Sequence, residues 1–331
     1  MHTEIVERIG VGGESPEGDN SAYLVGDRAL VDPGPPTDDA WADLRAGLER
    51  AGVAPSDLEA VLVTHWHVDH AGLAPRLADA ADATLAMGTG DAPLVADYAV
   101  ERDRRLERDR ETMRRWGVPA DAIESVLEDD TPSPMPDSIP VERLADGDRI
   151  AGLEAVSTPG HTLGHTAFAA GDVLLVGDAV LPTYTPNVGG SDTRTLRSAS
   201  TDSRVQEPPE SVVDGDPLAA YLETLDRLAD RSERLLPGHG ETIQPDRIPT
   251  IRDHHRERTR RVLTALERRA DDDSDREGTS PWRLAVDLFG DLEGSHVKFG
   301  AGEAAAHCRR LERDGVVERV ANDPVSYDPI E

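Results

Sequence analysis

The stretch VLVTHWHVDH, residues 61–70, places three histidines and an aspartate within six positions directly after an apolar run. The apolar residues 60–63 predict a short buried strand, and the polar residues predict the loop that follows it. Crowded imidazoles beside a carboxylate help neither a core nor a helix. His65 and His67, two positions apart in such a loop, can instead converge on one ion, and neutral imidazole is a common zinc ligand.

Asp69 and His70 add a second set of donors, which the loop geometry cannot send to the same ion in the same way. The stretch therefore indicates two adjacent metals, provided that other segments contribute ligands. His161 in TPGHTLGH, Asp178 in LLVGDA and His239 in LPGHGE each follow a predicted strand. A carboxylate such as Asp178 can bridge two cations roughly 3.5–4 Å apart.

The same order of strand, glycine turn and polar residue recurs along the chain. Around it, residues 22–32 predict a hairpin with Gly26 and Asp27 at its turn, and residues 38–51 predict an amphipathic helix. Residues 97–117 predict a highly charged helix. Further strands are expected at residues 84–86, 154–156, 173–176 and 234–236.

Four motifs in this order, THWHVDH, TPGHTLGHT, LLVGDAVL and LLPGHGETI, resemble the metallo-β-lactamase superfamily over roughly residues 1–250. The resemblance implies an α/β fold, an αββα sandwich with metals at one edge between its two sheets. It implies two zinc ions, or another divalent metal such as iron or manganese. By this resemblance the first metal is bound by His65, His67 and His161, the second by Asp69, His70 and His239, and Asp178 bridges them. His165 is expected to be structural.

The residue at His67 favours hydrolysis, since the di-iron redox branch of the superfamily carries a glutamate there. The stretch after Asp178 also lacks the arginine-aspartate pattern of persulfide dioxygenases. The expected chemistry is attack by a metal-bridging hydroxide on a polarised carbonyl or phosphoryl group. Asp69 is the expected catalytic residue, because it can orient the hydroxide and pass its proton to the leaving group.

Residues 251–331 differ in charge from the rest of the chain. They carry 18 acidic and 14 basic residues, whereas residues 1–250 carry 47 and 21. Helices at 251–270, 281–290 and 301–313 and a strand at 315–320 suggest a winged-helix-like C-terminal domain after a catalytic domain of residues 1–250. This architecture resembles lactamase-like hydrolases that carry such a module, a group that includes an animal endoribonuclease.

Two activities are weighed. The preferred one is hydrolysis of a small ester or thioester, similar to that of the glyoxalase II-related hydroxyacylglutathione hydrolases. The alternative is a metal-dependent endoribonuclease or phosphodiesterase acting on single-stranded RNA. The chain shows no basic stripe with interleaved aromatics, and only 4% of its residues are aromatic. A third hypothesis makes the tail a binding module, although the mixed charges of 301–313 disfavour duplex DNA. The sequence leaves open whether the chain forms a homo-oligomer.

The amino-acid composition indicates the kind of solution in which the protein works. The 65 acidic and 35 basic residues give a net charge of −30, and Lys298 is the only lysine. At molar salt, where the Debye length is about 3 Å, such self-repulsion is screened. A salt-rich cytoplasm, such as that of a halophilic archaeon, is expected. The single cysteine, Cys308, fits a reducing compartment, and neither a membrane segment nor a secretory signal is expected.

Residues 182–190, PTYTPNVGG, follow the bridging aspartate and are expected to form a wall of the substrate pocket. Tyr184 and Asn187 are the groups in this segment suited to contact a substrate. The charged helix around residues 99–116 is a candidate roof.

Overall fold

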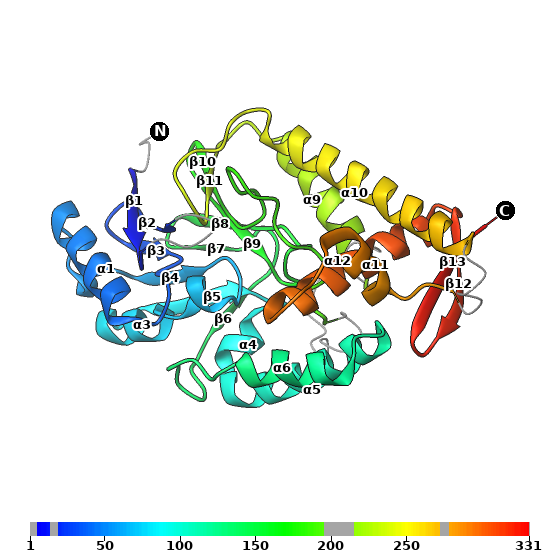
Figure 1. Cartoon of the computed structure of the whole chain (residues 1–331). Helices are drawn as coiled ribbons and strands as arrows, with labels where there is room; N and C mark the ends of the chain where they lie inside the picture. Colours follow the sequence, from blue (N-terminus) through cyan, green and yellow to red (C-terminus); the bar gives the residue numbers. More distant parts are fainter. Residues whose placement is uncertain (1–4, 14–18, 195–214, 272–277, 331) are drawn as a thin grey trace.

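The structure is a computed structural model that describes residues 5–13, 19–194, 215–271 and 278–330. A six-stranded sheet, in the order β1-β2-β3-β4-β5-β6, occupies the N-terminal part (Figure 1). Strands β3 to β6 run parallel, so their carboxyl ends meet at one edge. The strands are β1 (Val6–Val11), β2 (Asn20–Val25), β3 (Ala29–Val31), β4 (Ala60–Val63), β5 (Thr84–Gly88) and β6 (Glu142–Leu144).

A second sheet has the order β11-β10-β9-β8-β7. β10 and β11 run parallel and end at the same edge, while the other neighbours are antiparallel. Its strands are β7 (Arg149–Ile150), β8 (Leu153–Ser157), β9 (Thr166–Ala170), β10 (Val173–Gly177) and β11 (Arg234–Pro237).

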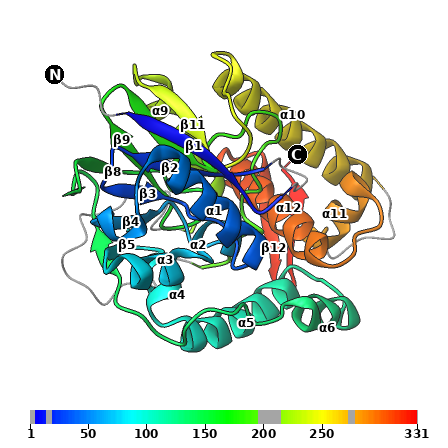
Figure 2. The same ribbon diagram turned by 90° about the vertical axis from the view of Figure 1, so that its left-hand side faces the viewer.

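The helices cover the outer faces of both sheets and connect their strands (Figures 1 and 2). Among the described helices, none is long and apolar enough to cross a lipid bilayer. The helices up to the second sheet's last strand are α1 (Asp38–Ala51), the 3-10 turn η1 (Pro55–Asp57), α2 (Val68–Ala71), α3 (Ala74–Ala81), α4 (Ala92–Ala96), α5 (Tyr98–Arg115), α6 (Ala120–Asp129) and α9 (Pro217–Ala229).

Side-chain alternation along the strands builds four layers. In β4, Val61 and Val63 pack against α1 and α3, while Ala60 and Leu62 face the second sheet. In β10, alternate residues face either the first sheet or the helices α9 and α10. Successive strand residues point to opposite faces, so each strand supplies two cores. The predicted αββα sandwich is confirmed.

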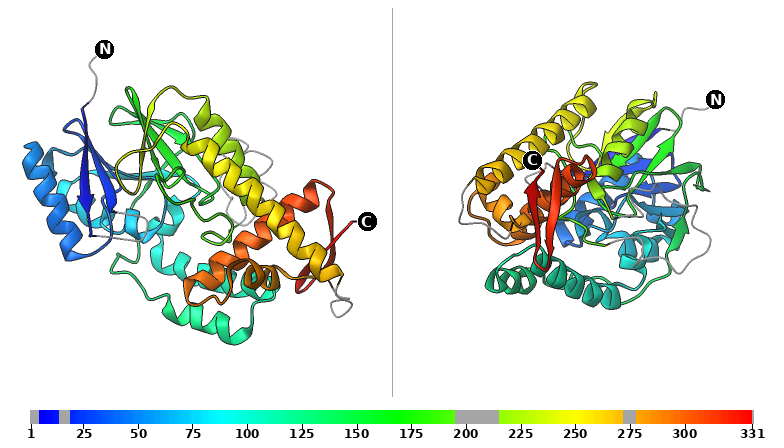
Figure 3. Two further views of the ribbon diagram at one scale, coloured as in Figure 1. Left: turned by 45° about the horizontal axis from the view of Figure 1, so that its top comes forward. Right: turned by 90° about the vertical axis from the view of Figure 1, so that its right-hand side faces the viewer.

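The C-terminal region consists of α10 (Arg247–Ala270), α11 (Pro281–Phe289), α12 (Ser295–Arg313) and the hairpin of β12 (Val317–Asn322) and β13 (Val325–Pro329). Figure 3 shows this hairpin beside the helices. α10 crosses the predicted domain boundary, since Ile248 and Ile251 pack in the core of the second sheet and Val262 and Leu266 pack with α11 and α12. The assignment to the winged-helix class and the boundary at 250 stay predictions.

Helix α12 begins at Ser295, six residues before the expected start. The prediction placed the start too late because glycines, which are poor helix formers, interrupt the apolar pattern of this segment. Two of these glycines, Gly300 and Gly302, allow close packing against neighbouring residues. A Cβ at Gly302 would lie 2.4 Å from Gly190 Cα and 2.5 Å from the Gly189 oxygen, so the helix backbone touches the loop after Asp178 directly.

We expect Gly302→Ala to lower the free energy of unfolding by about 1–3 kcal/mol, despite the better helix propensity of alanine. The reason is that the new methyl group meets backbone atoms, which cannot rotate away. Gly300→Ala is the matched control: its Cβ would meet the end of the Leu292 side chain at 2.7 Å, which can move. Urea denaturation compares the two, and equal midpoints would contradict the close contact.

Candidate metal centre

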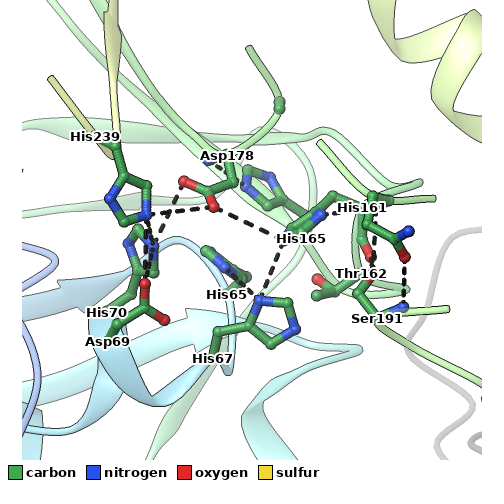
Figure 4. A network of polar contacts seen from close by, with 12 residues as sticks. His65, His67, Asp69, His70, His161, Thr162, His165, Asp178, Ser191 and His239 are labelled. Carbon is green, nitrogen blue, oxygen red and sulfur yellow. Dashed lines mark hydrogen bonds and ion pairs between the residues drawn. The ribbon is translucent and has the colours of Figure 1, made fainter. Parts of the chain in front are cut away.

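Seven donor side chains from four segments meet at the edge where β4, β10 and β11 end (Figure 4). They form three groups whose nitrogen and carboxylate atoms lie within 4.8 Å of one another and that could hold metal ions. We call these residues the ligand cluster. Its groups are His65, His67 and His161; His65, His70 and Asp178; and Asp69, His70 and His239.

The first group has the spacing of a metal site. His67 Nδ1 lies 3.0 Å from His65 Nε2 and 3.1 Å from His161 Nε2. A tetrahedral zinc ion with bonds of roughly 2.0–2.1 Å separates its ligand nitrogens by roughly 3.3 Å. The three lone pairs therefore converge at about the distance that one cation requires.

The third group, Asp69, His70 and His239, is equally tight, and Asp178 lies between it and the first group. His70 Nε2 and His239 Nε2 are 3.2 Å apart, and Asp69 Oδ2 is 3.3 Å from His239 Nε2. Asp178 Oδ1 is 3.4 Å from His70 Nε2, and its Oδ2 is 3.8 Å from His161 Nε2. Asp178 Oδ1 is buried and accepts no hydrogen bond in the described structure. A cation would satisfy this oxygen.

Hydrogen bonds behind the rings orient the imidazoles. Thr64 Oγ1 donates to Asp32 Oδ2 at 2.8 Å, so it accepts from His65 Nδ1 at 3.0 Å. His161 Nδ1 donates to the Asn187 carbonyl at 2.9 Å. His70 Nδ1 lies 3.2 Å from Asp32 Oδ2. These bonds leave each Nε2 with a lone pair aimed into the cluster.

The pKa shifts in the ligand cluster come from burial and from the close approach of its charged side chains. Burial lowers the pKa of His65, with His70 adding to the effect, and burial lowers the pKa of His67 to about 3. Burial also works against the charge of His239, but hydrogen bonds to Asp178 and Asp69 outweigh it and raise its pKa to about 9. A cation bound to these carboxylates would displace the proton.

Sequence reasoning missed two residues that hold the cluster in place. Asp32, in the DPGPP turn, accepts the Thr64 backbone N–H at 2.8 Å and is 3% exposed. Asn20 Nδ2 donates to the Asp69 carbonyl at 2.8 Å. Both follow or begin a strand, but a single Asp before Pro also signals an ordinary turn. His165 lies beside the cluster, stacked on His65 with ring centroids 5.0 Å apart, and its Nε2 accepts the Asp178 N–H.

A second buried network, the Asp91 clamp, joins the loops that carry the first group. It consists of Asp91, Asp192 and Arg194. Arg194 pairs with Asp91 and Asp192 and donates to the Gly90 carbonyl at 2.6 Å. The clamp thus ties the loop after Asp178 to α4.

The carboxylates of the Asp91 clamp then hold the ligand loops. Asp91 accepts from Trp66 N at 3.2 Å, from Thr162 Oγ1 at 2.6 Å and from Gly164 N at 2.9 Å. Asp192 accepts from the Leu163 N–H at 2.9 Å. Trp66 sits between two cluster histidines and Thr162 follows a third, so the clamp sets their spacing.

A pocket of about 390 Å³ opens over the ligand cluster. As expected, residues 184–187 line it, and Tyr184 is 51% exposed. The opposite side comes from α11, α12 and the loop between them, including Phe289, Leu292 and Phe299. Residues of α5, the expected roof, are not among the lining residues of the described chain.

The Asn187 side chain is already engaged. Its Oδ1 accepts from the N–H groups of Gly190 and Ser191 at 3.1 and 2.9 Å, and its Nδ2 donates to the Phe299 carbonyl at 3.3 Å. Asn187 thereby holds the loop and, through its carbonyl, His161. Its role as a substrate contact stays a prediction.

We expect Tyr184→Phe to reduce turnover about tenfold or less while metal content and melting temperature stay unchanged. Tyr184 lines the pocket with half of its surface exposed, and its hydrogen bond within the described part of the chain uses the backbone carbonyl, which accepts from Arg247. Asn187→Ala should also lower the melting temperature. Steady-state kinetics and thermal unfolding separate the two variants. Unaltered kinetics for Tyr184→Phe would make this residue a plain loop position.

Comparison with known proteins supports the fold and identifies the family. The family model described as "Metallo-beta-lactamase superfamily" matches residues 15–239. A probable metallo-hydrolase of Bacillus subtilis (strain 168) is 27% identical over 328 residues, which cover 96% of this chain and 95% of the relative.

Two crystal structures extend the likeness to the C-terminal region. A metallo-beta-lactamase family protein from Thermus thermophilus has a TM-score of 0.73 at 26% identity and covers 98% of both chains. A beta-lactamase domain protein from Burkholderia ambifaria has a TM-score of 0.67 at 23% identity, over 98% of this chain and 91% of that one. The second likeness shows the fold alone.

Proposed function

Because the chain belongs to the metallo-beta-lactamase superfamily and is a metal-dependent hydrolase, we propose that it holds two divalent cations, zinc ions by preference, and cleaves a small ester or thioester. The observation that carries this proposal is the convergence of seven buried or half-buried donors, with Asp178 between two groups of three. Imidazole nitrogens with one carboxylate per ion suit zinc and also suit iron.

The residues of this chain have distinct tasks in the proposed reaction. When bound, the cations supply an activated water and polarise the acyl oxygen. Asp69 is the most exposed carboxylate of the ligand cluster, with 41% of its side chain accessible, and it lines the pocket. We assign it the orientation of the attacking water and the transfer of its proton to the leaving alcohol or thiol. Water adds to the acyl carbon, the C–O or C–S bond breaks, and an acid is released.

The pocket chemistry supports an acyl substrate over RNA. None of the described residues that line the pocket is a lysine or an arginine. A phosphodiester chain needs such cations beside its phosphates, and salt weakens even those contacts. The net charge of −30 adds long-range repulsion against polyanions. We therefore propose a small-molecule substrate and rank the ribonuclease second.

The composition supports a proposed location in a salt-rich cytoplasm. Cys308 is fully buried, and burial raises the pKa of its thiol, so it behaves as a small apolar residue.

The C-terminal region contributes pocket residues, which supports a catalytic rather than a DNA-binding role for it. We propose that the isolated region binds no duplex DNA.

A substrate panel tests the function. Metal-reconstituted protein at high salt is offered p-nitrophenyl esters, acyl thioesters, lactones, a bis-phosphodiester and single-stranded RNA. We expect turnover of an ester or thioester that stops on chelation and returns with zinc. Asp69→Asn should lower kcat by more than it lowers metal content, because the amide oxygen can still bind a cation but cannot take up the proton of the attacking water. Turnover of RNA or the phosphodiester alone would overturn the proposal in favour of the nuclease.

A further inference from the structure

We propose that the C-terminal region forms an acyl-binding subsite that selects substrates with an apolar, uncharged acyl group. This inference rests on the proposed ester or thioester hydrolysis and names the substrate class. Its core is an apolar surface of Phe289, Leu292 and Phe299, called here the C-terminal wall, which lines the same pocket as Asp69 and Asp178.

The amino-acid usage makes the C-terminal wall unusual. The chain contains three phenylalanines in 331 residues, and two of them belong to this wall. The third, Phe168, is fully buried between the sheets. Phe289 and Leu292 contact the C-terminal core but stay only partly buried, so part of each side chain remains open to the pocket. Covering such a surface with an acyl chain contributes favourable free energy.

The Phe289 part of the wall is held in place by its neighbours. The Arg258 guanidinium stacks on the Phe289 ring at 4.5 Å from its centroid and pairs with Glu303 Oε1 at 2.8 Å. Gly300 lacks a side chain that would push Leu292 and Phe289 away from α12, since its Cβ would lie 2.7 Å from Leu292 Cδ1. A rigid apolar surface costs little entropy when a ligand binds to it.

Hydrogen bonds also fix the position of the wall relative to the ligand cluster. The Phe299 carbonyl accepts from Asn187 Nδ2, and the Asn187 carbonyl accepts from His161 Nδ1. Two hydrogen bonds therefore connect the backbone of α12 to the ring of a cluster histidine. An acyl chain lying on Phe299 is placed at a fixed position relative to the cluster.

Charge determines the kind of acyl group. Beyond the ligand cluster, the one carboxylate among the described lining residues is Glu303, and the cation nearest to it, Arg258, is committed to that pair. Burial raises the pKa of Glu303. A terminal carboxylate on the acyl chain would meet no lysine or arginine among the described lining residues, and the imidazole of His296 beside the wall is exposed to solvent. The carboxylate would therefore lose hydration without gaining a buried cationic partner. An apolar chain meets ring and aliphatic carbon.

The test uses the zinc-loaded full chain and p-nitrophenyl acetate, butyrate, hexanoate and monosuccinate. Butyrate and monosuccinate share four carbons and differ in the terminal carboxylate. We expect kcat/KM to rise at least about tenfold from acetate to hexanoate, and monosuccinate to be at least about tenfold poorer than butyrate. Phe299→Ala and Leu292→Ala should flatten the chain-length profile. Val286→Ala, an exposed apolar position of α11 outside the pocket, should keep it.

A binding measurement separates the subsite from the activity. Hexanohydroxamate should bind at least about tenfold more tightly than acetohydroxamate by calorimetry, and Phe299→Ala should reduce that ratio to below about threefold. Hydrolysis of all esters with a flat profile and equal hydroxamate affinities would overturn the subsite and leave the hydrolase intact. Absence of ester and thioester turnover would overturn the proposed function, and the hydroxamate ratio would then decide the subsite alone.

Discussion

Asp178→Ala is expected to remove the metal from both proposed sites of the ligand cluster, the one at His65, His67 and His161 and the one at Asp69, His70 and His239. Asp178 is the one residue whose two oxygens reach toward both groups, at 3.4 Å from His70 and 3.8 Å from His161. Without it, His239 and His70 lose a carboxylate partner and each cation loses a negative ligand. We expect metal content to fall from about two ions per chain to below one, and kcat/KM to fall on the order of a thousandfold.

Elemental analysis after dialysis against buffered zinc measures the metal content, and the zinc-dependent rise in melting temperature checks metal binding independently. Steady-state kinetics measure kcat/KM. Asp172→Ala is the matched control, because Asp172 lies exposed just before the same strand and its removal changes the net charge equally. This control should retain metal and activity. Two tightly held ions in Asp178→Ala would show that the groups do not share this carboxylate.

Local patterns predicted the elements whose own residues determine them. β4 and α1 occupy the predicted ranges 60–63 and 38–51, since each has a clear apolar pattern. β9, with the sequence TAFAA, was missed because three of its five residues are alanine, which is depleted in strands. This strand is formed by its pairing with β8 and β10, which no local pattern contains.

The candidate site divides in the same way. Its seven donors stand in short motifs at strand ends, so these positions and the family resemblance together predicted them, and the structure brings all seven together. Asp32 and the C-terminal wall were not predicted. An apolar residue of an amphipathic helix looks the same whether it faces a core or a pocket, and Phe299 acquires its place only through the contact of α12 with residues 187–190. The expected roof, α5, was placed by charge and helicity alone.

Arg194→Met is expected to be the most destabilising substitution outside the ligand cluster. The Asp91 clamp buries two carboxylates around one guanidinium: Asp91 is fully buried, and the side chains of Asp192 and Arg194 are each 7% exposed. Burial opposes the charge of Arg194, but Asp192 and Asp91 outweigh it and raise its pKa. Methionine fills a similar volume yet leaves both carboxylates without their cation.

Removing one partner from a buried ion pair costs about 3–5 kcal/mol, and we expect a loss of this size in the free energy of unfolding. Arg231→Met, at a partly exposed pair with Glu233 two residues away, is the control and should cost about 1 kcal/mol or less. Urea denaturation at constant high salt compares the two. The clamp also holds Trp66 and Thr162, so zinc affinity should fall in Arg194→Met even where the protein stays folded. Equal unfolding midpoints for both variants would contradict this expectation, because the two carboxylates would then be stabilised by protonation or by water without Arg194.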